Sequence, residues 1–522
     1  QVKMRRIILL GLVLLMAVSI VTAGMVAGDS ARAEGSVIYV NASATGAGDG
    51  SSWEDAYTDL QDALSAASSG DEIWVAAGTY VPGTERWQSF SMKNGVGIYG
   101  GFPASGNPGW EDRDWVENET ILSGDIGVPG DASDNSYNVF YHSKQTGLNN
   151  SAILNGFIIT GGAGDGGALH NHNSSPTITN CVFSDNCSPW GDGGAIYNND
   201  SSPTLVNCVF HSNSAGGDGG AIYNKKSSPV ITNCVFHNNS AGGTGGALFD
   251  FNVPSEVTNC ILRGNSPGEI GNKNATSLVT YSDIQGGYEG AGNIDEEPRF
   301  VDAGSGDFRL QPLSPCVDAG DNAASALPES DFFRNARIRG STVDMGVHEA
   351  PITVVISVEL EAPRDAPAGW EIPVSIDFYD SGASWEAGSG EPPAGDVRHS
   401  FSGTTEYNSE TQRVEYRCTG VTEGTYDILV KGETTLANIR DDVTVAGSFT
   451  VDMGTLLEGD CNGNGYHVNA RDWAVFQPAW LSSEGDPKYD PRADLNRDGH
   501  VNAHDWSLFQ PKWLSKGPRE IS

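Results

Sequence analysis

A repeat of 26 or 27 residues occupies the middle of the chain and constrains its fold more than any other feature of the sequence. Three nearly identical segments begin at Ser174, Ser201 and Ser227, and a fourth that keeps the apolar positions begins at Val253. The cysteines of these segments, from Cys181 onward, are separated by 27, 26 and 26 residues. Periods in this range are typical of solenoids, propellers and arrays, in which neighbouring units bury each other's apolar faces.

Each repeat contains three short stretches of strand-forming residues, separated by Gly, Asn, Ser and Pro, and shows no helical periodicity. This pattern excludes ankyrin-like and leucine-rich repeats, which require a different spacing and composition. Three strands per repeat, closed by tight turns, predict a right-handed parallel β-helix. Equivalent residues of successive coils then stack about 4.8 Å apart. The predicted interior positions are Phe183, Phe210, Phe236, Leu262, Ile178, Leu205, Ile231 and Val257.

Asparagines and cysteines recur in step with the repeat. Stacked asparagines can hydrogen-bond their side-chain amides along the axis, which explains why a turn position repeats this residue. The repeated cysteines alternate with outward-facing valines, so we interpret them as small apolar fillers of the interior rather than disulfide partners or metal ligands. The asparagine series are Asn180, Asn207, Asn233, Asn259 and Asn186, Asn213, Asn239, Asn265; the cysteines are Cys181, Cys208, Cys234 and Cys260. The pairing of Cys187, Cys316, Cys418 and Cys461 stays open.

Motifs outside the repeat resemble one family of exported proteins. They include Y-V-N-A-S-A-T-G from Tyr39, L-N-G-F-I-I-T-G-G from Leu154, S-P-C-V-D-A-G-D from Ser314 and V-D-M-G-V-H-E ending at Glu349. Together they resemble parallel β-helix proteins of the choice-of-anchor Q type, over residues 36–350. The resemblance implies a fold and a surface location, and no particular reaction. It also implies one helix, at residues 55–67, that caps the N-terminal end of the solenoid.

The first residues show the pattern of an export signal. A basic segment that ends at Arg6 precedes an apolar run over residues 7–21, and Ala31-Arg32-Ala33 offers a small-x-small cleavage site. The apolar run is short for a membrane anchor, and no second span follows it. We therefore expect residues 1–33 to be a signal peptide, and the mature chain to be secreted without a transmembrane anchor.

The charge of the chain excludes two kinds of partner. With 67 acidic and 30 basic residues the formal net charge is -37, which argues against nucleic acid and anionic membrane surfaces. Disorder does not explain this composition, because 38% of the residues are hydrophobic and 9% are aromatic. The acidic surface fits a protein that binds divalent cations or one that is merely soluble.

Two columns of the predicted β-helix are candidates for ligand binding. One holds the aspartates of the G-D-G-G loops, and the other holds aromatic residues expected to face outward. Aromatic faces can stack on sugar rings while carboxylates accept hydrogen bonds from sugar hydroxyls. The alternative is structural, because stacked aromatics stabilise neighbouring strands and exposed carboxylates about 5 Å apart repel by only about 0.8 kcal/mol. The predicted ligand-binding residues are Asp165, Asp192, Asp218, His170, Tyr197, Tyr223 and Phe249.

The sequence offers little for catalysis. A lyase would need a basic residue near the acidic column, and nothing distinguishes Lys225, Lys226 or Arg263 in that role. The paired-Asp and Gly-His-Gly patterns that we associate with polygalacturonases are absent. His211 and His237 should stack on the outer face, where a histidine pair is more often solvated surface than a catalytic site. We lean against an enzyme; if there is one, it is a polysaccharide lyase or glycoside hydrolase.

Two acidic loops near the C-terminus have the spacing of calcium sites. The second fits D-x-[DN]-x-[DN]-G with a carboxylate at the twelfth position, and alternating carboxylates and amides supply the hard oxygens that Ca²⁺ prefers. The first loop carries one extra residue, at Tyr466 or His467, which favours weaker binding there. The predicted calcium ligands are Asp494, Asn496, Asp498, His500 through its carbonyl, Asn502 and Asp505, and in the first loop Asp460, Asn462, Asn464 and Asp472.

Each acidic loop leads into a segment D-W-x-x-F-Q-P-x-W-L, whose aromatic residues fall on one helical face. Two calcium loops, each followed by a helix, resemble a type I dockerin, which implies a cohesin-like partner. The resemblance places partner contacts at Ala503 and His504 in the second loop, and at Ala470 and Arg471 in the first. The Ser-Thr pair common at such positions is missing, so a known cellulosomal cohesin need not bind. A purely structural calcium module is the alternative.

The sequence therefore predicts a mainly β protein. It divides into a signal peptide (1–33), a parallel β-helix with an N-terminal cap (34–350), an Ig-like antiparallel β-sandwich (351–455) and a small helical dockerin-like module (456–522). We expect it to bind polysaccharide or cell-surface glycan and to be assembled or displayed through its calcium-dependent tail. The alternatives are a polysaccharide lyase or glycoside hydrolase of a cellulosome-like complex, and a structural surface or filament protein.

Overall fold

The computed structural model describes residues 35–360, 373–380, 397–408, 413–432 and 438–456, together with short pieces between residues 479 and 520. The chain divides into two compact units, residues 1–350 and 351–522. The predicted calcium loops and the predicted signal peptide fall almost entirely outside the described residues.

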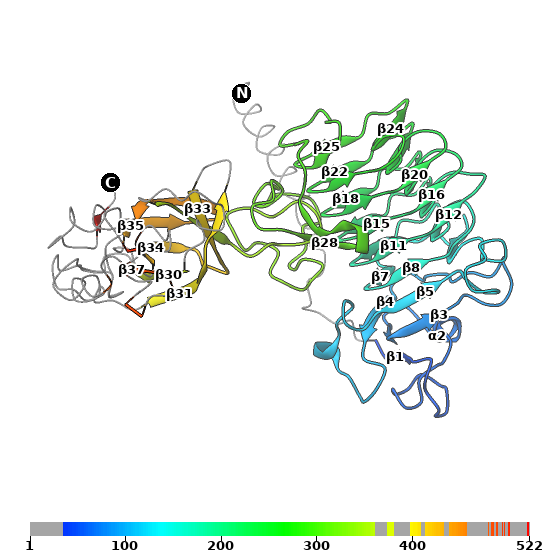
Figure 1. The fold of residues 1–522 in the computed structure, drawn as a ribbon. Helices are drawn as coiled ribbons and strands as arrows, with labels where there is room; N and C mark the ends of the chain where they lie inside the picture. Colours follow the sequence, from blue (N-terminus) through cyan, green and yellow to red (C-terminus); the bar gives the residue numbers. More distant parts are fainter. Residues whose placement is uncertain are drawn as a thin grey trace, which may run out of the picture. The chain divides into compact units, whose positions relative to one another are not determined.

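The first unit is a right-handed parallel β-solenoid, as the repeat predicts (Figure 1). Three sheets of nine, eight and six strands, which we call sheets A, B and C, follow one another around each coil. Equivalent strands of successive coils pair in parallel, so that Ile178 lies beside Leu205 and Phe183 beside Phe210. A short fourth sheet of three strands lies between sheets B and C along the chain.

Most strands of the solenoid are only three or four residues long, as expected where tight turns close each coil. Sheet A contains β1 (Val37–Val40), β2 (Glu72–Ala76), β4 (Gly97–Phe102), β7 (Ile153–Asn155), β10 (Thr177–Thr179), β14 (Thr204–Val206), β18 (Val230–Thr232), β22 (Glu256–Thr258) and β25 (Leu278–Thr280). Sheet B contains β3 (Gly78–Tyr80), β5 (Thr120–Ser123), β8 (Ile158–Thr160), β11 (Val182–Ser184), β15 (Val209–His211), β19 (Val235–His237), β23 (Ile261–Arg263) and β26 (Asp283–Ile284). Sheet C contains β6 (Phe140–His142), β9 (Leu169–His172), β13 (Ile196–Asn199), β17 (Ile222–Lys225), β21 (Leu248–Phe251) and β24 (Ile270–Lys273). The fourth sheet contains β12 (Cys187–Ser188), β16 (Ser214–Ala215) and β20 (Ser240–Ala241).

The interior of the solenoid is filled by the predicted residues. The rings of Phe183, Phe210 and Phe236 stack face to face, with centroids 4.6 and 4.7 Å apart. Full burial of each such ring contributes roughly 1.5–3 kcal/mol relative to an exposed one. The four repeated cysteines are buried and free, which confirms their interpretation as apolar fillers. Cys187, Cys316 and Cys418 are also free, and Cys461 lies outside the described residues.

Two asparagine series hold the turns in register. In the series that begins at Asn186, the side-chain amide of Asn186 donates to Asn213 (3.1 Å), that of Asn213 to Asn239 (2.9 Å) and that of Asn239 to Asn265 (2.8 Å). This ladder ends at Glu269, whose carboxylate accepts from the backbone and side-chain amides of Asn265. The series that begins at Asn180 turns the chain from sheet A into sheet B. Its asparagines have φ of 51–56°, a left-handed conformation that asparagine tolerates better than most residues.

The N-terminal cap is a helix, α2 (Leu60–Ala66), which buries Leu60, Ala63 and Leu64. Its N-cap is Asp59, which accepts a hydrogen bond from the backbone of Gln61 at 2.7 Å. The helix is shorter than predicted, because the preceding residues form turns in which Asp55 accepts from the backbone of Ala47. Two single-turn 3-10 segments, η1 (Trp110–Asp112) and η2 (Ala303–Ser305), are also present.

Residues 300–350, which we call the covering segment, pack over the outer face of sheet B. They include the hairpin of β27 (Phe300–Asp302) and β28 (Asp307–Leu310). Val209 and Val235 point out of the solenoid as predicted, but they are only 4% and 0% exposed because Phe308 and other covering side chains bury them. The expectation of a solvated outer face on sheet B is therefore wrong.

The described part of the second unit contains two larger sheets that enclose one hydrophobic core, the arrangement of a β-sandwich. One sheet has the order β32 (Glu406–Asn408), β33 (Arg413–Thr419), β29 (Thr353–Leu360), β36 (Phe449–Leu456). The other has the order β31 (Val397–Thr404), β30 (Pro373–Asp380), β34 (Gly424–Gly432), β35 (Asn438–Val445), β39 (Arg519–Glu520). Most pairs are antiparallel, but β29 with β36 and β35 with β39 are parallel, which the alternation of side chains did not predict. A short antiparallel pair joins β37 (Ser482–Ser483) to β38 (His500–Val501).

Candidate functional site

The aspartates of the G-D-G-G loops connect successive coils through hydrogen bonds. The carboxylate of Asp192 accepts from the backbone N–H of Asp218 (2.9 Å), and that of Asp218 accepts from the backbone and hydroxyl of Thr244 (2.8 and 3.2 Å). Asp165 accepts from the hydroxyl of Ser188 at 3.0 Å. Burial raises the pKa of Asp192 above its ordinary value. The column is therefore part of the scaffold, in addition to any contact with a ligand.

The predicted aromatic column forms on the outer face of sheet C. His170, Tyr197, Tyr223 and Phe249 stack in register, with ring centroids 4.8, 5.2 and 5.4 Å apart and interplanar angles of 8–16°. The stack continues to Tyr141 one coil earlier, at 5.1 Å from His170. Tyr141 could not be predicted, because its coil lies outside the recognisable repeat.

The rings of this column occupy each other's faces. Tyr223 and Phe249 are 8% and 4% exposed, whereas His170 and Tyr197 are half-buried. Burial raises the pKa of Tyr223 to about 12, as expected for a hydroxyl with little access to water. The column therefore presents ring edges to solvent rather than a row of flat faces. Its use as a ligand groove stays a prediction.

A cavity of about 590 Å³ lies between sheet B and the covering segment. Trp115, Phe308 and Phe333 supply aromatic walls, and His211 reaches it from β15. The lining carboxylates are Asp114, Glu117, Glu119 and Asp307, of which Asp307 pairs with Arg309 at 2.6 Å and Asp114 pairs with Arg334 at 3.0 Å. No sequence pattern marks this cavity, because its residues come from seven separate stretches that meet only after folding.

The histidines of sheet B belong to this covered region. The ring centroid of Phe308 lies 5.9 Å from that of His211 and 5.5 Å from that of His237. Burial lowers the pKa of both histidines, so they are largely neutral at neutral pH. The prediction that they form a solvated surface pair is therefore wrong, because the covering segment packs against them.

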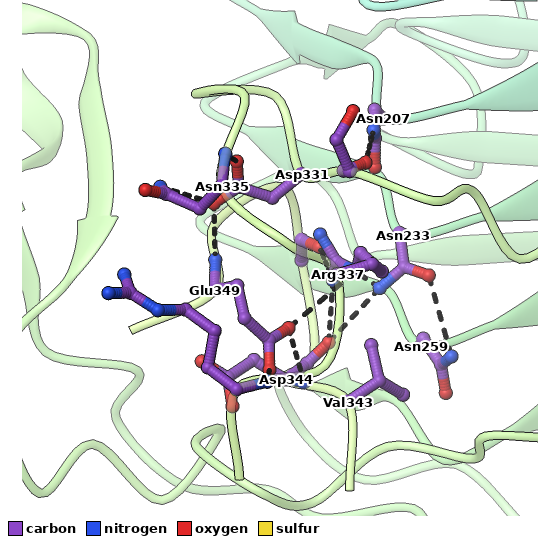
Figure 2. A network of polar contacts seen from close by, with 12 residues as sticks. Asn207, Asn233, Asn259, Asp331, Asn335, Arg337, Val343, Asp344 and Glu349 are labelled. Atoms are coloured by element: carbon purple, nitrogen blue, oxygen red, sulfur yellow. Dashed lines mark hydrogen bonds and ion pairs between the residues drawn. The ribbon is translucent and has the colours of Figure 1, made fainter. Parts of the chain in front are cut away.

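A buried polar network attaches the covering segment to the solenoid (Figure 2). The guanidinium of Arg337, 2% exposed, donates from Nη2 to the carbonyl oxygens of Asp344 and Gly346, at 2.8 Å each. Asn233 donates to the same two carbonyls, at 3.0 and 3.2 Å. Asn207 donates to the carbonyl of Ser330, at 2.9 Å. The left-handed turns of the solenoid are thus docking points for the covering segment.

Three carboxylates complete this network. Asp344 accepts from the backbone of Asp318 (2.7 Å) and Ala350 (2.6 Å), and Glu349 accepts from the backbone of Asp344 (3.1 Å). Asp331 accepts from the backbone of Glu349 at 2.8 Å. Burial raises the pKa of all three carboxyls, and the neighbouring Asp344 raises that of Glu349 further. The V-D-M-G-V-H-E motif, residues 343–349, is therefore part of the network that attaches the covering segment to the solenoid.

The predicted calcium and partner residues are not tested by the described structure. His500 lies in β38, whose backbone pairs with β37. All the others lie outside the described residues: Asp460, Asn462, Asn464, Asp472, Asp494, Asn496, Asp498, Asn502 and Asp505, with Ala470, Arg471, Ala503 and His504. Within the described residues no group of three or more His, Cys, Asp or Glu side chains is arranged to hold a metal ion. The same part of the chain contains no helix long and apolar enough to cross a membrane.

Comparison with known families assigns two regions of the chain. Residues 126–285 match the family described as right handed beta helix region, and residues 458–510 match the dockerin type I domain. The second match covers both acidic loops. A comparison with curated proteins found no match.

Solved structures give weaker similarities. An interface mutant of a type II cohesin–X–dockerin complex from Acetivibrio cellulolyticus is 18% identical, with a TM-score of 0.23 over 31% of this chain and 96% of that one. Pectate lyase Pel9A is 15% identical, with a TM-score of 0.38 over 60% and 96%. A rhamnogalacturonan lyase is 13% identical, with a TM-score of 0.28 over 48% and 68%. Similarities this low carry no argument about function.

Proposed function

We propose that this chain is an exported component of a cohesin–dockerin assembly, and that its β-helix contacts polysaccharide or cell-surface glycan. The observation that carries the proposal is the match of residues 458–510 to the dockerin type I domain, on a chain whose first unit is a parallel β-solenoid. In this proposal residues 1–33 direct export, and residues 34–350, 351–455 and 456–522 form the β-helix, the sandwich and the dockerin-like module.

Calcium is the cofactor that the two acidic loops would hold. Asp494, Asn496, Asp498 and Asp505 supply hard side-chain oxygens at the spacing of a twelve-residue calcium loop. His500 would add its carbonyl, and Asn502 its side chain or a bridged water. The bound ion would order the loop and so present Ala503 and His504 to a cohesin-like partner. Ala470 and Arg471 are the corresponding contacts in the first loop.

Binding to cohesins tests this half of the proposal. The full chain should bind at least one member of a cohesin panel in Ca²⁺, and EDTA should abolish the complex because the loops lose their ligand. Asp494→Ala with Asp498→Ala should have the same effect as EDTA. Asp185→Ala, an exposed aspartate of the solenoid, is the matched control and should bind like wild type. Calcium-independent capture, or no capture by any cohesin, would contradict the proposal.

The glycan half rests on the chemistry of the solenoid surface. Aromatic side chains and carboxylates occur together on its coils, and this combination suits sugars, which have apolar ring faces and hydroxyl edges. The His170, Tyr197, Tyr223 and Phe249 column with Asp165, Asp192 and Asp218 is the site proposed from the sequence. Retention of the chain by polysaccharides in native gels measures this binding.

The cavity over sheet B favours a second candidate, a polysaccharide lyase or glycoside hydrolase. It places several carboxylates and His211 beside an aromatic wall, in a volume of about 590 Å³. Incubation of the chain with polysaccharides, followed by assays for unsaturated and reducing-end products, separates the two candidates. Products that disappear in His211→Ala would favour the enzyme, whereas binding without products favours the non-catalytic proposal.

A further inference from the structure

The loops that connect sheet B to sheet C expose a group of large apolar side chains. We call this region the B–C corner; it comprises residues 81–89, 124–139, 161–168 and 187–195 of four successive coils. Single exposed apolar residues are ordinary, but several large ones on the loops of one corner are candidates for ligand contacts. The exposed fractions are 37% for Val81, 72% for Trp87, 63% for Val128, 47% for Tyr137 and 98% for Trp190.

Trp190 is an extra residue in the repeat. Ser188 pairs with Ala215, an offset of 27, whereas Ile196 pairs with Ile222, an offset of 26, so one residue is inserted between them. The backbone of Gly217 donates to the carbonyl of Gly191, and Pro189 lies against Gly216, which leaves Trp190 as the insertion. The 27-residue spacing in the sequence thus corresponds to a tryptophan that contributes nothing to the core.

The preceding coil brings a carboxylate next to this tryptophan. The loop of this preceding coil has five residues, between Ala163 and Leu169. The equivalent positions two coils later, Ser214 and Ile222, are separated by seven residues, so the loop is two residues shorter. Asp165 in this short loop is exposed, and it lies so close to Gly191 that a Cβ there would be 1.7 Å from its Oδ1.

Tyr137 lies on the other side of the short loop. A Cβ on Gly164 would come within 2.8 Å of its carbonyl oxygen. Arg86 lies over its ring, 4.5 Å from the centroid. Trp87 and Trp190 are three coils apart, about 14 Å along the axis at the usual rung spacing. The corner therefore presents aromatic side chains along the axis with an aspartate between them.

We propose that Trp87, Tyr137 and Trp190, together with Asp165, bind an uncharged polysaccharide that runs along the B–C corner. This inference rests on the glycan half of the proposed function and gives it a location and a ligand class. The aromatic rings would contact the apolar faces of sugar rings, and Asp165 would accept hydrogen bonds from sugar hydroxyls.

The charges and the spacing of the side chains at the B–C corner favour an uncharged polysaccharide over an acidic polysaccharide or a protein partner. Asp165, Asp192 and Asp218 follow one another along the same loops, so an acidic polymer would be repelled. A protein partner would require a continuous apolar centre of several hundred Å². Here the aromatic side chains are separated by glycine-rich loops and polar backbone, which suits successive sugar units better than a protein surface.

Native gel electrophoresis of the full chain tests the inference. Gels containing glucomannan or arabinoxylan are compared with gels containing polygalacturonate and with gels without polymer. Wild type should be retarded by at least one of the two uncharged polymers and not by polygalacturonate. Trp190→Ala should need about tenfold more polymer for the same retardation, the effect of losing one aromatic contact that the bound polymer buries. Deletion of Trp190, which restores the 26-residue period, should have the same effect.

The control is Leu278→Ala, which removes a side chain that is 62% exposed on sheet A, away from the corner. It should leave the retardation unchanged, and thermal unfolding should show all variants folded like wild type. If the uncharged polymers retard wild type and both Trp190 variants equally, the inference is wrong while the proposed function stands. Retardation by polygalacturonate that depends on Trp190 would refute the ligand class. If no polymer retards wild type, the glycan half of the proposed function falls with the inference, and cohesin capture remains an independent test.

Discussion

At the scale of single residues, buried asparagines keep the coils of the solenoid in register. The side-chain oxygen of Asn239 accepts from both the backbone (3.0 Å) and the side chain (2.9 Å) of Asn213. Its amide donates to the carbonyl of Phe210 (2.9 Å) and to Asn265 (2.8 Å). Every polar atom of this buried side chain therefore has a partner in a neighbouring coil, and its loss leaves groups in both coils unpaired.

Asn239→Ala should lower the free energy of unfolding of the first unit by about 2–4 kcal/mol, because each buried polar group left without a partner costs about 1–3 kcal/mol. Urea denaturation of the full chain measures the change. The control is Ser240→Ala at the adjacent exposed position, which should change stability by less than about 0.5 kcal/mol. Equal effects of the two substitutions would contradict the structural importance of the ladder.

The positions that could be predicted from the sequence are those that recur with the repeat. Cys208 and Asn213 recur in all four repeats and Phe210 in three of them, so their stacking positions could be predicted and are confirmed. Glu269, which ends the asparagine ladder, and Arg337, which holds the covering segment, each occur once. A residue that ends a series or joins two distant segments has no periodic signal, and so sequence reasoning missed both.

At the scale of elements, the covering segment converts the outer face of sheet B into a second core. The hairpin β27–β28 brings Phe308 over Val209 and Val235, and over the rings of His211 and His237. The repeat predicts the valines and histidines as an outward row, but no pattern in the sequence tells which face a later segment will cover. The cavity beside them could not be predicted for the same reason.

Phe308→Ala should raise the pKa of His211 and His237 toward the ordinary value near 6.5, because burial is the main cause of their lowered pKa. It should also destabilise the first unit by about 3–5 kcal/mol through the cavity it creates. An NMR titration of the imidazole signals measures the pKa change. Val301→Ala, on the exposed side of the same hairpin, is the control. Unchanged histidine pKa values in Phe308→Ala would show that the hairpin does not cover them.

At the scale of the whole molecule, buried ionisable groups set how stability depends on pH. Burial raises the pKa of Glu269 to about 7, so folding binds a proton there and stability falls as pH rises from about 4.5 to about 7. Glu349 and Asp344 act in the same direction. Burial lowers the pKa of His142 and His348 to about 4, so these two histidines reduce the stability of the folded protein as pH falls from about 6.5 to about 4. The two effects oppose each other below pH 6.5, and of these groups the carboxyls alone still change their protonation above it.

The unfolding temperature of the full chain should therefore decrease between pH 6.5 and pH 8.5, at constant calcium and ionic strength. Glu269→Gln should flatten the part of this decrease near pH 7, because the variant has no carboxyl to ionise, and it should gain about 1–3 kcal/mol on wild type at pH 8.5. Differential scanning calorimetry across this range measures both. Glu85→Gln, at an exposed position, is the control. An unfolding temperature that rises toward pH 8.5, or the same profile in Glu269→Gln, would contradict the assignment.

The architecture of the whole chain was the part most accessible from sequence. A period of 26 or 27 residues leaves few folds possible, and the match of residues 126–285 to the right handed beta helix region agrees with the solenoid it predicts. The spacing of the acidic loops likewise agrees with the dockerin type I match. Strand direction in the second unit was less accessible, because alternating side chains identify a strand such as β36 without specifying the neighbour it pairs with.

One measurement tests the central claim, that this molecule connects a cohesin-bearing assembly to polysaccharide. A cohesin that binds the chain is immobilised on a biosensor surface, the full chain is loaded in Ca²⁺, and an uncharged polysaccharide is then passed over it. We expect a second mass increase that depends on the loaded chain, and EDTA should remove chain and polysaccharide together. A loaded chain that captures no polysaccharide, or polysaccharide capture that survives EDTA, would contradict it.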